Sequence, residues 1–241
     1  ICRKLGLRSG MRLLDVGCGW GGMIIHAARH HGVDAVGITL SKNQADLASK
    51  AVAEAGVANQ CEVRYQDYRE VSDGPFDAIS SIGMFEHVGL ARISAYFGTL
   101  FGLLGPGGRL LNHAISRRPG PARLEPNSFV GRYVFPDGQL IEVGWVVTAM
   151  QEHGFEVRDL EALREHYALT LRRWVANLEG SWDQAVGLAG LPRAKIWRLY
   201  MAGSALAFEA GRISVHQVLG IKPLSEAGSG MPLTRRELLA S

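Results

Sequence analysis

The feature that most constrains this fold is a glycine-rich loop that lies directly between a short apolar segment and a helix-forming one. Residues 12–16 are predicted to form a buried strand, and Gly17, Gly19 and Gly22 follow it in the pattern G-x-G-x-x-G. The next residues, to about Arg29, have the period of a helix. A strand, a glycine turn and a helix in this order open a doubly wound sheet, in which a ligand approaches bare backbone beside the helix N-terminus.

The rest of the chain repeats this alternation and predicts an α/β fold with a doubly wound, mostly parallel sheet. The expected strands cover residues 12–16, 35–39, 62–65, 76–81, 109–115, 155–160 and 214–220. The expected helices run to residue 29 and cover 41–55, 91–104, 146–153, 169–179 and 193–210. The Gly-Pro-Gly-Gly run that begins at Gly105 is expected to separate a helix from the strand after it.

Two segments have no clean period. Residues 116–142 are rich in Pro, Arg and Gly and predict a long loop or lid, and a long unpatterned loop inside a domain is often functional. Residues 223–241 predict a flexible, frayed tail. The chain is therefore expected to hold one domain, residues 1–222, with a lid insertion and a helical patch near its C-terminus.

Composition narrows the class of protein. The 241 residues suit one domain, and 26 Lys+Arg against 23 Asp+Glu give a net charge of +3, too little to predict nucleic-acid binding. Three cysteines without a CxxC pattern favour neither a disulfide framework nor a zinc site, and they fit a reducing, cytoplasmic setting. No run of about 18 apolar residues and no signal peptide is found. Because the chain begins with Ile1, we expect an N-terminal segment to be missing.

The residues around the glycine loop favour one nucleoside cofactor over another. Asp15 ends the first strand, where it can accept hydrogen bonds from loop amides or from a ligand's amine. A dinucleotide site expects an acidic residue at the end of the second strand, to bind a ribose. That position holds Thr39, Leu40 and Ser41, and the nearest acid, Asp46, lies inside the next helix. S-adenosylmethionine, which brings no pyrophosphate, remains the expected ligand.

Two further polar positions have both a structural and a functional interpretation. Ser41 to Gln44 matches a capping box, so Gln44 can contact a ligand or reach back to the helix start. Asp67 and Tyr68 follow the third strand, where an acceptor and a ring could hold an adenine or form a polar turn. Cys18 is interpreted as a small residue packed under the glycine turn rather than as a nucleophile, and Trp20 as a packing residue at the helix start.

Polar residues also follow the fourth and fifth strands. Glu86 and His87 come after the fourth strand, and His113 lies in the fifth with Ile115, so all are expected near the carboxyl edge of the sheet. Glu86 needs a partner among its apolar neighbours, whereas His87 is interpreted as a satisfied core group. Tyr167 is predicted at a helix start. Adjacent His30 and His31 lack the usual spacing of metal ligands, and no metal is expected.

Taken in order, seven sequence motifs resemble one protein family. They are LLDVGCGWGG, GITLSKNQ, YQDY, GMFEHVG, GPGGRLLNHAI, YVFPDGQL and HYALTLRRW. Their succession resembles the cyclopropane fatty acid synthase family, which includes the mycolic acid cyclopropane synthases, over nearly the whole chain to about Pro223. The FEH motif and the Tyr-x-x-Thr-Leu-x-x-Trp block are far more specific than the glycine loop.

The resemblance implies a seven-stranded class I methyltransferase fold, which is Rossmann-like. It implies transfer of the methyl of S-adenosylmethionine to the cis double bond of a phospholipid acyl chain, with a carbocation that loses a proton to close a cyclopropane ring. The implied base is a bound bicarbonate, held by a cysteine together with Glu86, His113, the backbone of Ile115 and Tyr167. The implied cofactor contacts, besides Asp15, are Gly17, Gly19, Thr39, Leu40, Gln44, Asp67 and Tyr68.

Cation chemistry sets further expectations. Water would trap a carbocation, so the site should be dry and lined by rings, for which Phe85, Tyr167 and Trp174 are candidates, under a lid at 116–142. The family's cysteine lies upstream of the first strand, in a segment that this chain does not reach, and neither Cys2 nor Cys18 replaces it. Arginines that could meet anionic head groups, or be solvated surface residues, are Arg117, Arg118, Arg123, Arg172 and Arg173.

Several functions stay open at this point. Relatives with similar motifs form methyl or methylene branches or methylate small amines, and a catalytically dead module that binds cofactor or lipid is a further alternative. The expected partners are phospholipids with unsaturated acyl chains at a membrane surface and a second copy in a homodimer, but no nucleic acid. The expected location is cytoplasmic, with peripheral attachment to the membrane.

Overall fold

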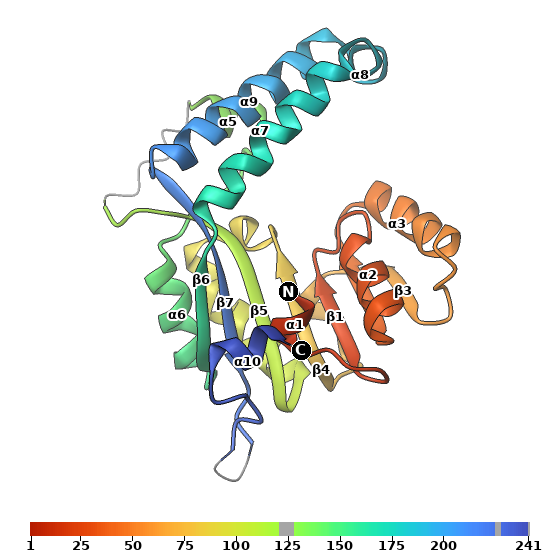
Figure 1. Ribbon diagram of the computed structural model, residues 1–241, viewed down its shortest axis with the longest axis vertical. Helices are drawn as coiled ribbons and strands as arrows, with labels where there is room; N and C mark the ends of the chain where they lie inside the picture. Colours follow the sequence, from red (N-terminus) through yellow and green to blue (C-terminus); the bar gives the residue numbers. More distant parts are fainter. Residues whose placement is uncertain (121–127, 225–227, 241) are drawn as a thin grey trace.

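A computed structural model describes residues 1–120, 128–224 and 228–240 and confirms the doubly wound architecture. Seven strands form one sheet in the order β3-β2-β1-β4-β5-β7-β6 (Figure 1). All neighbouring strands are parallel except β7, which runs antiparallel to both β5 and β6. The strands are β1 Arg12–Val16, β2 Asp34–Thr39, β3 Cys61–Tyr65, β4 Phe76–Ile82, β5 Leu104–Arg117, β6 Glu156–Ala162 and β7 Ile213–Ile221.

Helices cover both faces of this sheet, and a helical arm extends beyond its carboxyl edge (Figure 1). The α-helices are α1 Cys2–Leu5, α2 Gly22–His31, α3 Lys42–Glu54, α4 Ile93–Leu103, α5 Phe129–Tyr133, α6 Val143–Glu152, α7 Arg164–Gly180, α8 Trp182–Ala189, α9 Leu191–Glu209 and α10 Arg235–Ala240. Three 3₁₀ helices, η1 Tyr68–Glu70, η2 Phe85–His87 and η3 Leu90–Arg92, follow strand ends or precede α4. No helix in the described parts of the chain is long and apolar enough to cross a membrane.

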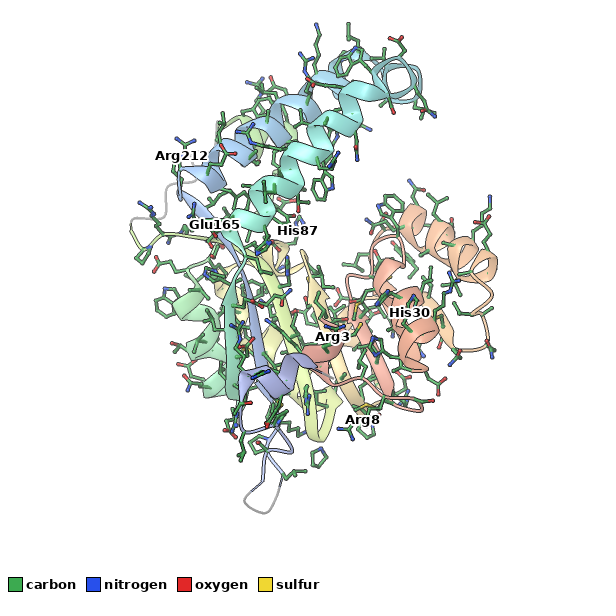
Figure 2. The ribbon with its side chains drawn as sticks, in the orientation of Figure 1. Arg3, Arg8, His30, His87, Glu165 and Arg212 are labelled. Atoms are coloured by element: carbon green, nitrogen blue, oxygen red, sulfur yellow. The ribbon has the colours of Figure 1, made fainter. Side chains whose placement is uncertain are left out.

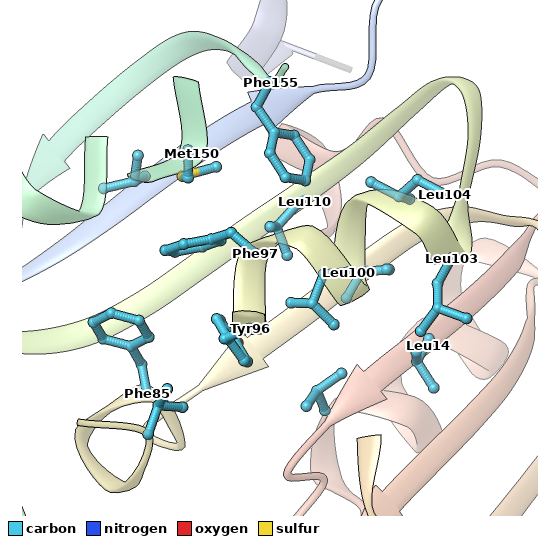
Figure 3. Close-up of a cluster of buried hydrophobic side chains, with 14 of the residues drawn as sticks. Leu14, Phe85, Tyr96, Phe97, Leu100, Leu103, Leu104, Leu110, Met150 and Phe155 are labelled. Carbon is cyan, nitrogen blue, oxygen red and sulfur yellow. The ribbon is translucent and has the colours of Figure 1, made fainter. Parts of the chain in front are cut away.

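Alternation along the strands divides the interior into two cores. Leu13 faces α1 and α2, whereas its neighbour Leu14 faces the aromatic core under α4 and α6. Figure 3 shows this second core, in which Tyr96 and Phe97 of α4 lie beside Phe85. Because these side chains are almost wholly buried, they fix the position of η2 and of the residues it carries.

The helical arm has a small core of its own. Leu171 of α7 and Met201 and Phe208 of α9 pack together with Val215 at the start of β7. The sequence had not predicted α8, which joins α7 to α9 at the outer end of the arm (Figure 1). The arm is anchored at the sheet by α7 and α9, and most of its length has no second layer of helices around it.

Four details differ from the sequence predictions. Strand β5 begins at Leu104, so the Gly-Pro-Gly-Gly run forms an irregular start of the strand rather than a stop before it. The predicted lid contains the short helix α5, whose N-cap Ser128 accepts a hydrogen bond from the Gly131 amide; its residues 121–127 lie outside the described part of the chain. The predicted tail contains α10, and Leu238 is buried against the core beside α1. Trp20 is 60% exposed instead of packed.

Candidate functional site

The glycine loop meets the carboxyl edge of β1 at the point where the strand order reverses, between β1 and β4. Gly17, Gly19 and Gly21 have φ angles of 81°, 54° and 84°, a region that favours glycine. The amides of Gly17 and Cys18 both donate to the carbonyl of Ile38, at 3.0 and 2.9 Å, which ties the loop to β2. Gly21 is the N-cap of α2, so the helix N-terminus opens directly beside the bare backbone of the loop.

Cys18 is packed in the way that the sequence predicted. It is buried beneath the loop and lies against Gly37, where a Cβ added to the glycine would come within 2.8 Å of the Cys18 Cβ. Burial, with Asp15 nearby, raises the pKa of the Cys18 thiol to about 12. A thiol in this environment stays protonated, and this excludes it as a nucleophile at neutral pH.

Asp15 is buried at the end of β1, and its partner comes from the neighbouring strand. The Ser80 hydroxyl donates to Oδ1 of Asp15 at 2.6 Å, rather than a loop amide as the sequence had allowed. Burial raises the pKa of Asp15 to about 6, although the hydrogen bond from Ser80 opposes this shift. The carboxyl group therefore titrates close to neutrality beside the glycine loop.

The end of β2 joins the start of α3 through side-chain hydrogen bonds. The Ser41 hydroxyl caps α3 by accepting from the Gln44 amide at 3.4 Å, as predicted. The Gln44 side chain does not complete the box: its Oε1 accepts from the Thr39 hydroxyl at 2.8 Å, and Thr39 in turn accepts from the Ser41 amide at 3.2 Å. Leu40 between them is 65% exposed. This leaves an apolar side chain in the open beside two oriented polar groups.

Asp67 and Tyr68 lie after β3, at the same edge. Asp67 caps η1 and pairs with Arg69, whose Nη2 lies 2.6 Å from Oδ2, and this hydrogen bond lowers the pKa of the carboxyl group. The Tyr68 ring packs edge-on against Tyr96, with 5.3 Å between centroids. Both predicted interpretations are thus compatible with this turn. We name the eight residues discussed around the loop the glycine-loop cluster: Asp15, Gly17, Gly19, Thr39, Leu40, Gln44, Asp67 and Tyr68.

Glu86 has a structural partner for only one of its carboxylate oxygens. The amide of Ile115 donates to Oε1 at 2.8 Å, and this bond joins η2 to β5. Oε2 is sealed from solvent and has no hydrogen-bond partner among the described residues. Burial raises the pKa of Glu86 above its ordinary value, against the opposing effect of the Ile115 amide. A carboxyl group in this state is poised to bind something further.

His113 and Tyr167 lie near this carboxyl group from two other elements. Gln217 of β7 lies 3.3 Å from Nδ1 of His113, and burial lowers the pKa of this imidazole to about 4. Because the amide nitrogen of Gln217 is the donor, the neutral ring carries its proton on Nε2. The Tyr167 ring lies 6.4 Å from that of His113, and burial, with Tyr200 and Glu86, raises the pKa of Tyr167 to about 12.

We name this second set of residues, Glu86, His113, Ile115 and Tyr167, the Glu86 cluster. It adjoins the glycine-loop cluster, because Met84, two residues before Glu86, packs directly against Gly17. Every titratable member of the Glu86 cluster is biased toward its uncharged form by burial. The cluster therefore offers neutral hydrogen-bond donors in an apolar setting.

The structure overturns the prediction for one neighbour of Glu86 and leaves that for the other open. His87 is exposed rather than a core group, and it lies beside the base of the helical arm (Figure 2) with its ring 5.8 Å from Phe135. Phe85, a candidate lining residue, packs between Tyr96 and Phe97 and borders a small cavity together with Ile115, so its role as lining stays a prediction. The 3₁₀ turn of η2 explains both findings, because three successive residues point in different directions.

Several contributors were missed by sequence reasoning. The backbone N–H of Gln139 donates to the Glu86 carbonyl at 2.8 Å, and its side-chain Oε1 accepts from the Leu90 amide at 2.9 Å. These two bonds join η2 and η3 to the lid segment. Phe135, Trp197 and Tyr200 form mutual edge-to-face contacts between the lid and α9. Only the aromatic content of these segments could have signalled them, because the lid and α9 lie about 60 residues apart in sequence.

Two of the candidate arginines form ion pairs with acidic side chains, and two others are exposed. Arg117 is held by Glu142 at 3.0 Å and by backbone carbonyls of its own loop, so its role is structural. Arg172 pairs with Glu209 of α9 through two hydrogen bonds of 2.5 and 2.8 Å. Arg118 and Arg173 are exposed, and Arg123 lies outside the described residues.

The sheet order, the antiparallel β7 and the glycine loop at the β1 edge together define a class I S-adenosylmethionine-dependent methyltransferase fold. The family model described as mycolic acid cyclopropane synthetase matches residues 1–218. The chain belongs to this family, which confirms the resemblance found in its motifs.

Known relatives support this assignment. A probable fatty acid methyltransferase of Mycobacterium tuberculosis is 48% identical over 97% of this chain and 54% of its own length. The solved cyclopropane synthase MmaA2 of the same organism has a TM-score of 0.85 at 33% identity, covering 91% of this chain and 80% of that one. The mycolic acid cyclopropane synthase CmaA1, solved in complex with SAH and CTAB, has a TM-score of 0.83 at 35% identity over the same shares. The chain spans about half the length of the first curated relatives it matches.

Proposed function

We propose that the protein containing this chain transfers the methyl group of S-adenosylmethionine to the cis double bond of an unsaturated phospholipid acyl chain, and that the product is a cyclopropane ring. The observation that carries the proposal is the carboxyl group of Glu86, with one oxygen held by the Ile115 amide and the other buried without a partner among the described residues. A neutral, water-free hydrogen-bonding centre is what a reaction through a carbocation requires.

The glycine-loop cluster fits S-adenosylmethionine, which supplies an electrophilic methyl group when bound. The bare backbone at Gly17 and Gly19 lets the ligand approach the N-terminus of α2. Asp15 can accept from an amine, and the exposed Leu40 can cover an apolar part of the ligand. Asp67 and Tyr68 supply an acceptor and a ring for a nucleoside. The binding of SAH by the related CmaA1 supports the same assignment.

The Glu86 cluster fits a bicarbonate ion, which would supply a weak base when bound. Oε2 of Glu86 lacks a partner among the described residues, so a protonated carboxyl group can donate a hydrogen bond there. The Nε2–H of His113 and the phenol of Tyr167 are two further neutral donors, kept in this state by burial. Neutral donors can bind a singly charged anion without adding a cation that would repel the developing carbocation.

The residues of this chain then have three tasks in the reaction. The glycine-loop cluster orients the donor toward the Glu86 cluster across the contact between Gly17 and Met84. Phe208 and Trp174 pack against the ring of Tyr167. The electron-rich ring of Tyr167 would stabilise the carbocation that forms in the proposed reaction. Glu86, His113 and Tyr167 hold the proton-accepting group in place, and the surrounding apolar side chains exclude water.

The helical arm supports an acceptor that is part of a lipid. Leu169, Leu188 and Leu199 are 68%, 83% and 59% exposed, on a segment that extends beyond the sheet. Arg193 and Lys195 are exposed on α9 in the same arm. Apolar side chains beside basic ones are suited to the boundary between anionic head groups and acyl chains. We therefore propose that the arm faces a membrane surface when substrate binds.

The test is the product itself. The full-length protein is incubated with methyl-labelled S-adenosylmethionine and vesicles of a cis-monounsaturated phospholipid, and the acyl chains are then analysed by mass spectrometry before and after mild hydrogenation. We expect a gain of one CH₂ that carries the label, in a chain that takes up no hydrogen. Two relatives are named fatty acid methyltransferases, so a labelled branch is the specific rival product. If a labelled branch is found, the proposed cyclopropane product is wrong, but methyl transfer to the acyl chain is retained.

A binding measurement separates the cofactor from the acceptor. Calorimetric titration with S-adenosylhomocysteine is expected to give saturable heat with one site per chain. A protein that binds this ligand and leaves every acyl chain unchanged would be a binding module, contrary to the proposal. Absence of binding in a folded protein would overturn the assignment of the glycine-loop cluster as well.

A further inference from the structure

A second cluster of potential ligands lies outside the site described above, between the first two helices of the chain. Cys2 of α1 and His26 and His31 of α2 offer one sulfur and two nitrogen atoms that all lie within 4.8 Å of one another. Cys2 is buried, His31 is half-buried and His26 is exposed, so the group is open to solvent on one side. In Figure 2, the labelled residues Arg3 on α1 and His30 on α2 mark where this cluster lies.

We propose that Cys2, His26 and His31 form a binding site for a divalent transition metal of the zinc class. One thiolate and two imidazoles are ligands that Zn²⁺ prefers, and three protein ligands leave a fourth position for water or another group. With metal bonds of about 2.0–2.3 Å, tetrahedral ligand atoms stand roughly 3.3–3.7 Å apart. The present ligand atoms lie within 4.8 Å of one another, and His26, the most exposed of the three residues, has its ring 4.5 Å from that of His30.

The helices hold these residues together for reasons unrelated to the predicted reaction. Cys2 and Leu5 of α1 pack in the same core as Ile24 and Ala27 of α2, which fixes the thiol beneath one side of α2. The two histidines lie five residues apart, at the middle and the end of that helix. The sequence shows no metal pattern because Cys2 is more than 20 residues away and meets the histidines only in the fold.

The charges near the cluster favour a site that includes a thiolate. Arg3 and Arg8 line a cavity of about 350 Å³ next to His31, and these guanidinium groups disfavour a bare cation. Ionisation of Cys2 places a negative charge beside the metal and offsets this repulsion. A cysteine binds a metal as its thiolate, so binding releases the thiol proton to solvent. Glu237, which lines the same cavity, adds a second negative charge on this side of the molecule.

The site is spatially separate from methyl transfer but joined to it by one helix. His31 is the last residue of α2, and Gly22, its first, closes the glycine loop about 14 Å away along the helix. A metal at Cys2, His26 and His31 would bind α1 to the far end of α2. It is therefore expected to stabilise the fold without contacting a cofactor at the loop.

The experiment uses the full-length protein without a histidine tag, stripped with a chelator and titrated with Co²⁺ under reducing conditions. We expect a thiolate-to-cobalt charge-transfer band that saturates at one metal per chain and is abolished when Zn²⁺ is added. Cys2→Ser should remove the band, and His26→Gln or His31→Gln should weaken binding by at least about tenfold. Two matched controls, His30→Gln on the same helix and Cys61→Ser in the same core, should retain both band and affinity.

Other outcomes would overturn the proposal. A missing band, or one that persists in Cys2→Ser, would exclude the thiol as a ligand. Loss in His30→Gln with retention in His31→Gln would instead indicate a surface pair formed by His26 and His30, whose rings lie 4.5 Å apart. Circular dichroism checks that each variant is folded. If Cys2→Ser is not folded, the half-exposed His31→Gln decides: unchanged metal affinity in that variant rejects the site.

Discussion

The two clusters of the candidate site differ in how far apart their hydrogen-bonding partners lie along the chain. In the glycine-loop cluster, Thr39 bonds to Gln44 and Asp67 to Arg69, five and two residues away. In the Glu86 cluster, the Ile115 amide is 29 residues from Glu86, and Gln217 is 104 residues from His113. Asp15 and Gly17 of the first cluster also bond to distant partners, Ser80 and Ile38, but the hydrogen bonds of its other side chains come from local turns and caps. The second cluster exists only when β4, β5 and β7 are assembled.

This difference has energetic consequences. A group held by its own turn can be paired with a neighbouring charge, as Asp67 is: its side chain is only 11% exposed, but the hydrogen bond from the exposed Arg69 lowers the pKa of its carboxyl group. The half-buried Glu86 and His113, which are held by distant strands, have no such charged partner in their hydrogen bonds, and desolvation shifts the pKa of each toward its uncharged form. We infer that the first cluster determines whether a cofactor binds and the second determines the chemistry, which the following predictions test in order of decreasing effect.

The largest effect is expected from Glu86→Gln. The amide keeps the shape of the side chain, can still accept from Ile115 and can donate a hydrogen bond in place of Oε2, but unlike a carboxyl group it can neither take up nor release a proton. We expect turnover with cis-unsaturated phospholipid to fall by roughly 10²-fold or more. Calorimetric affinity for S-adenosylhomocysteine, which depends on the other cluster, should stay within about twofold of the parent.

His87→Gln is the matched control for that variant. It changes the next residue, which is exposed and does not contact the carboxyl group through any hydrogen bond in the described structure. Its turnover should stay close to that of the parent. Equal losses in the two variants would show that η2 as a whole is sensitive to substitution, and would contradict a special role for Glu86.

The contact between the two clusters is tested by alanine at two loop glycines. Both Gly17→Ala and Gly19→Ala strain a backbone with positive φ, at a cost of about 1–2 kcal/mol in the free energy of unfolding. Only Gly17→Ala also brings a new Cβ within 2.8 Å of the Cβ of Met84, which adds about 1–3 kcal/mol. Urea unfolding should therefore separate the two variants, and equal destabilisation would contradict a tight junction at Met84.

One residue of each cluster, His113 and Asp15, should respond to acid in opposite directions. The folded-state pKa of His113 is lowered to about 4, so the stability it contributes is present above about pH 6.5 and is lost as the pH falls toward 4. The folded-state pKa of Asp15 is raised to about 6 from 3.8, so its contribution is present at low pH and is lost as the pH rises through 6.

Two neutral variants measure these contributions separately. Between about pH 7 and pH 5, the parent should lose about 1–2 kcal/mol relative to His113→Gln and gain about 1–2 kcal/mol relative to Asp15→Asn. The measurement is the free energy of unfolding in urea at a series of pH values. Parallel pH profiles for the parent and both variants would mean that neither group is as buried as the structure indicates.

The same contrast explains which parts were predictable from sequence. The sheet, the glycine loop and the Ser41 cap depend on residues that are adjacent in the chain, and their prediction is confirmed. His87 and Trp20, both exposed, were placed wrongly, because a 3₁₀ turn and a loop have no period that assigns side chains to faces. Gln139, Gln217 and Tyr200 were missed, since only long-range contacts bring them to the site. Bicarbonate, lipid partner and homodimer remain predictions.

The smallest effect is expected at Arg69. Its guanidinium occupies both oxygens of Asp67, the acceptor that we assign to a nucleoside, so the free protein must exchange this contact for one with the ligand. In Arg69→Gln the carboxylate is available at once, and the affinity for S-adenosylhomocysteine should rise a few-fold in calorimetry. Because the pair is local and Arg69 is exposed, the free energy of unfolding should hardly change.

The control is Arg64→Gln, which removes a nearby arginine that pairs with Glu62 and Asp73 instead, and it should leave the affinity unaltered. If Arg69→Gln weakens binding, the arginine itself contacts the ligand, and the glycine-loop cluster would depend on a charged side chain for its affinity.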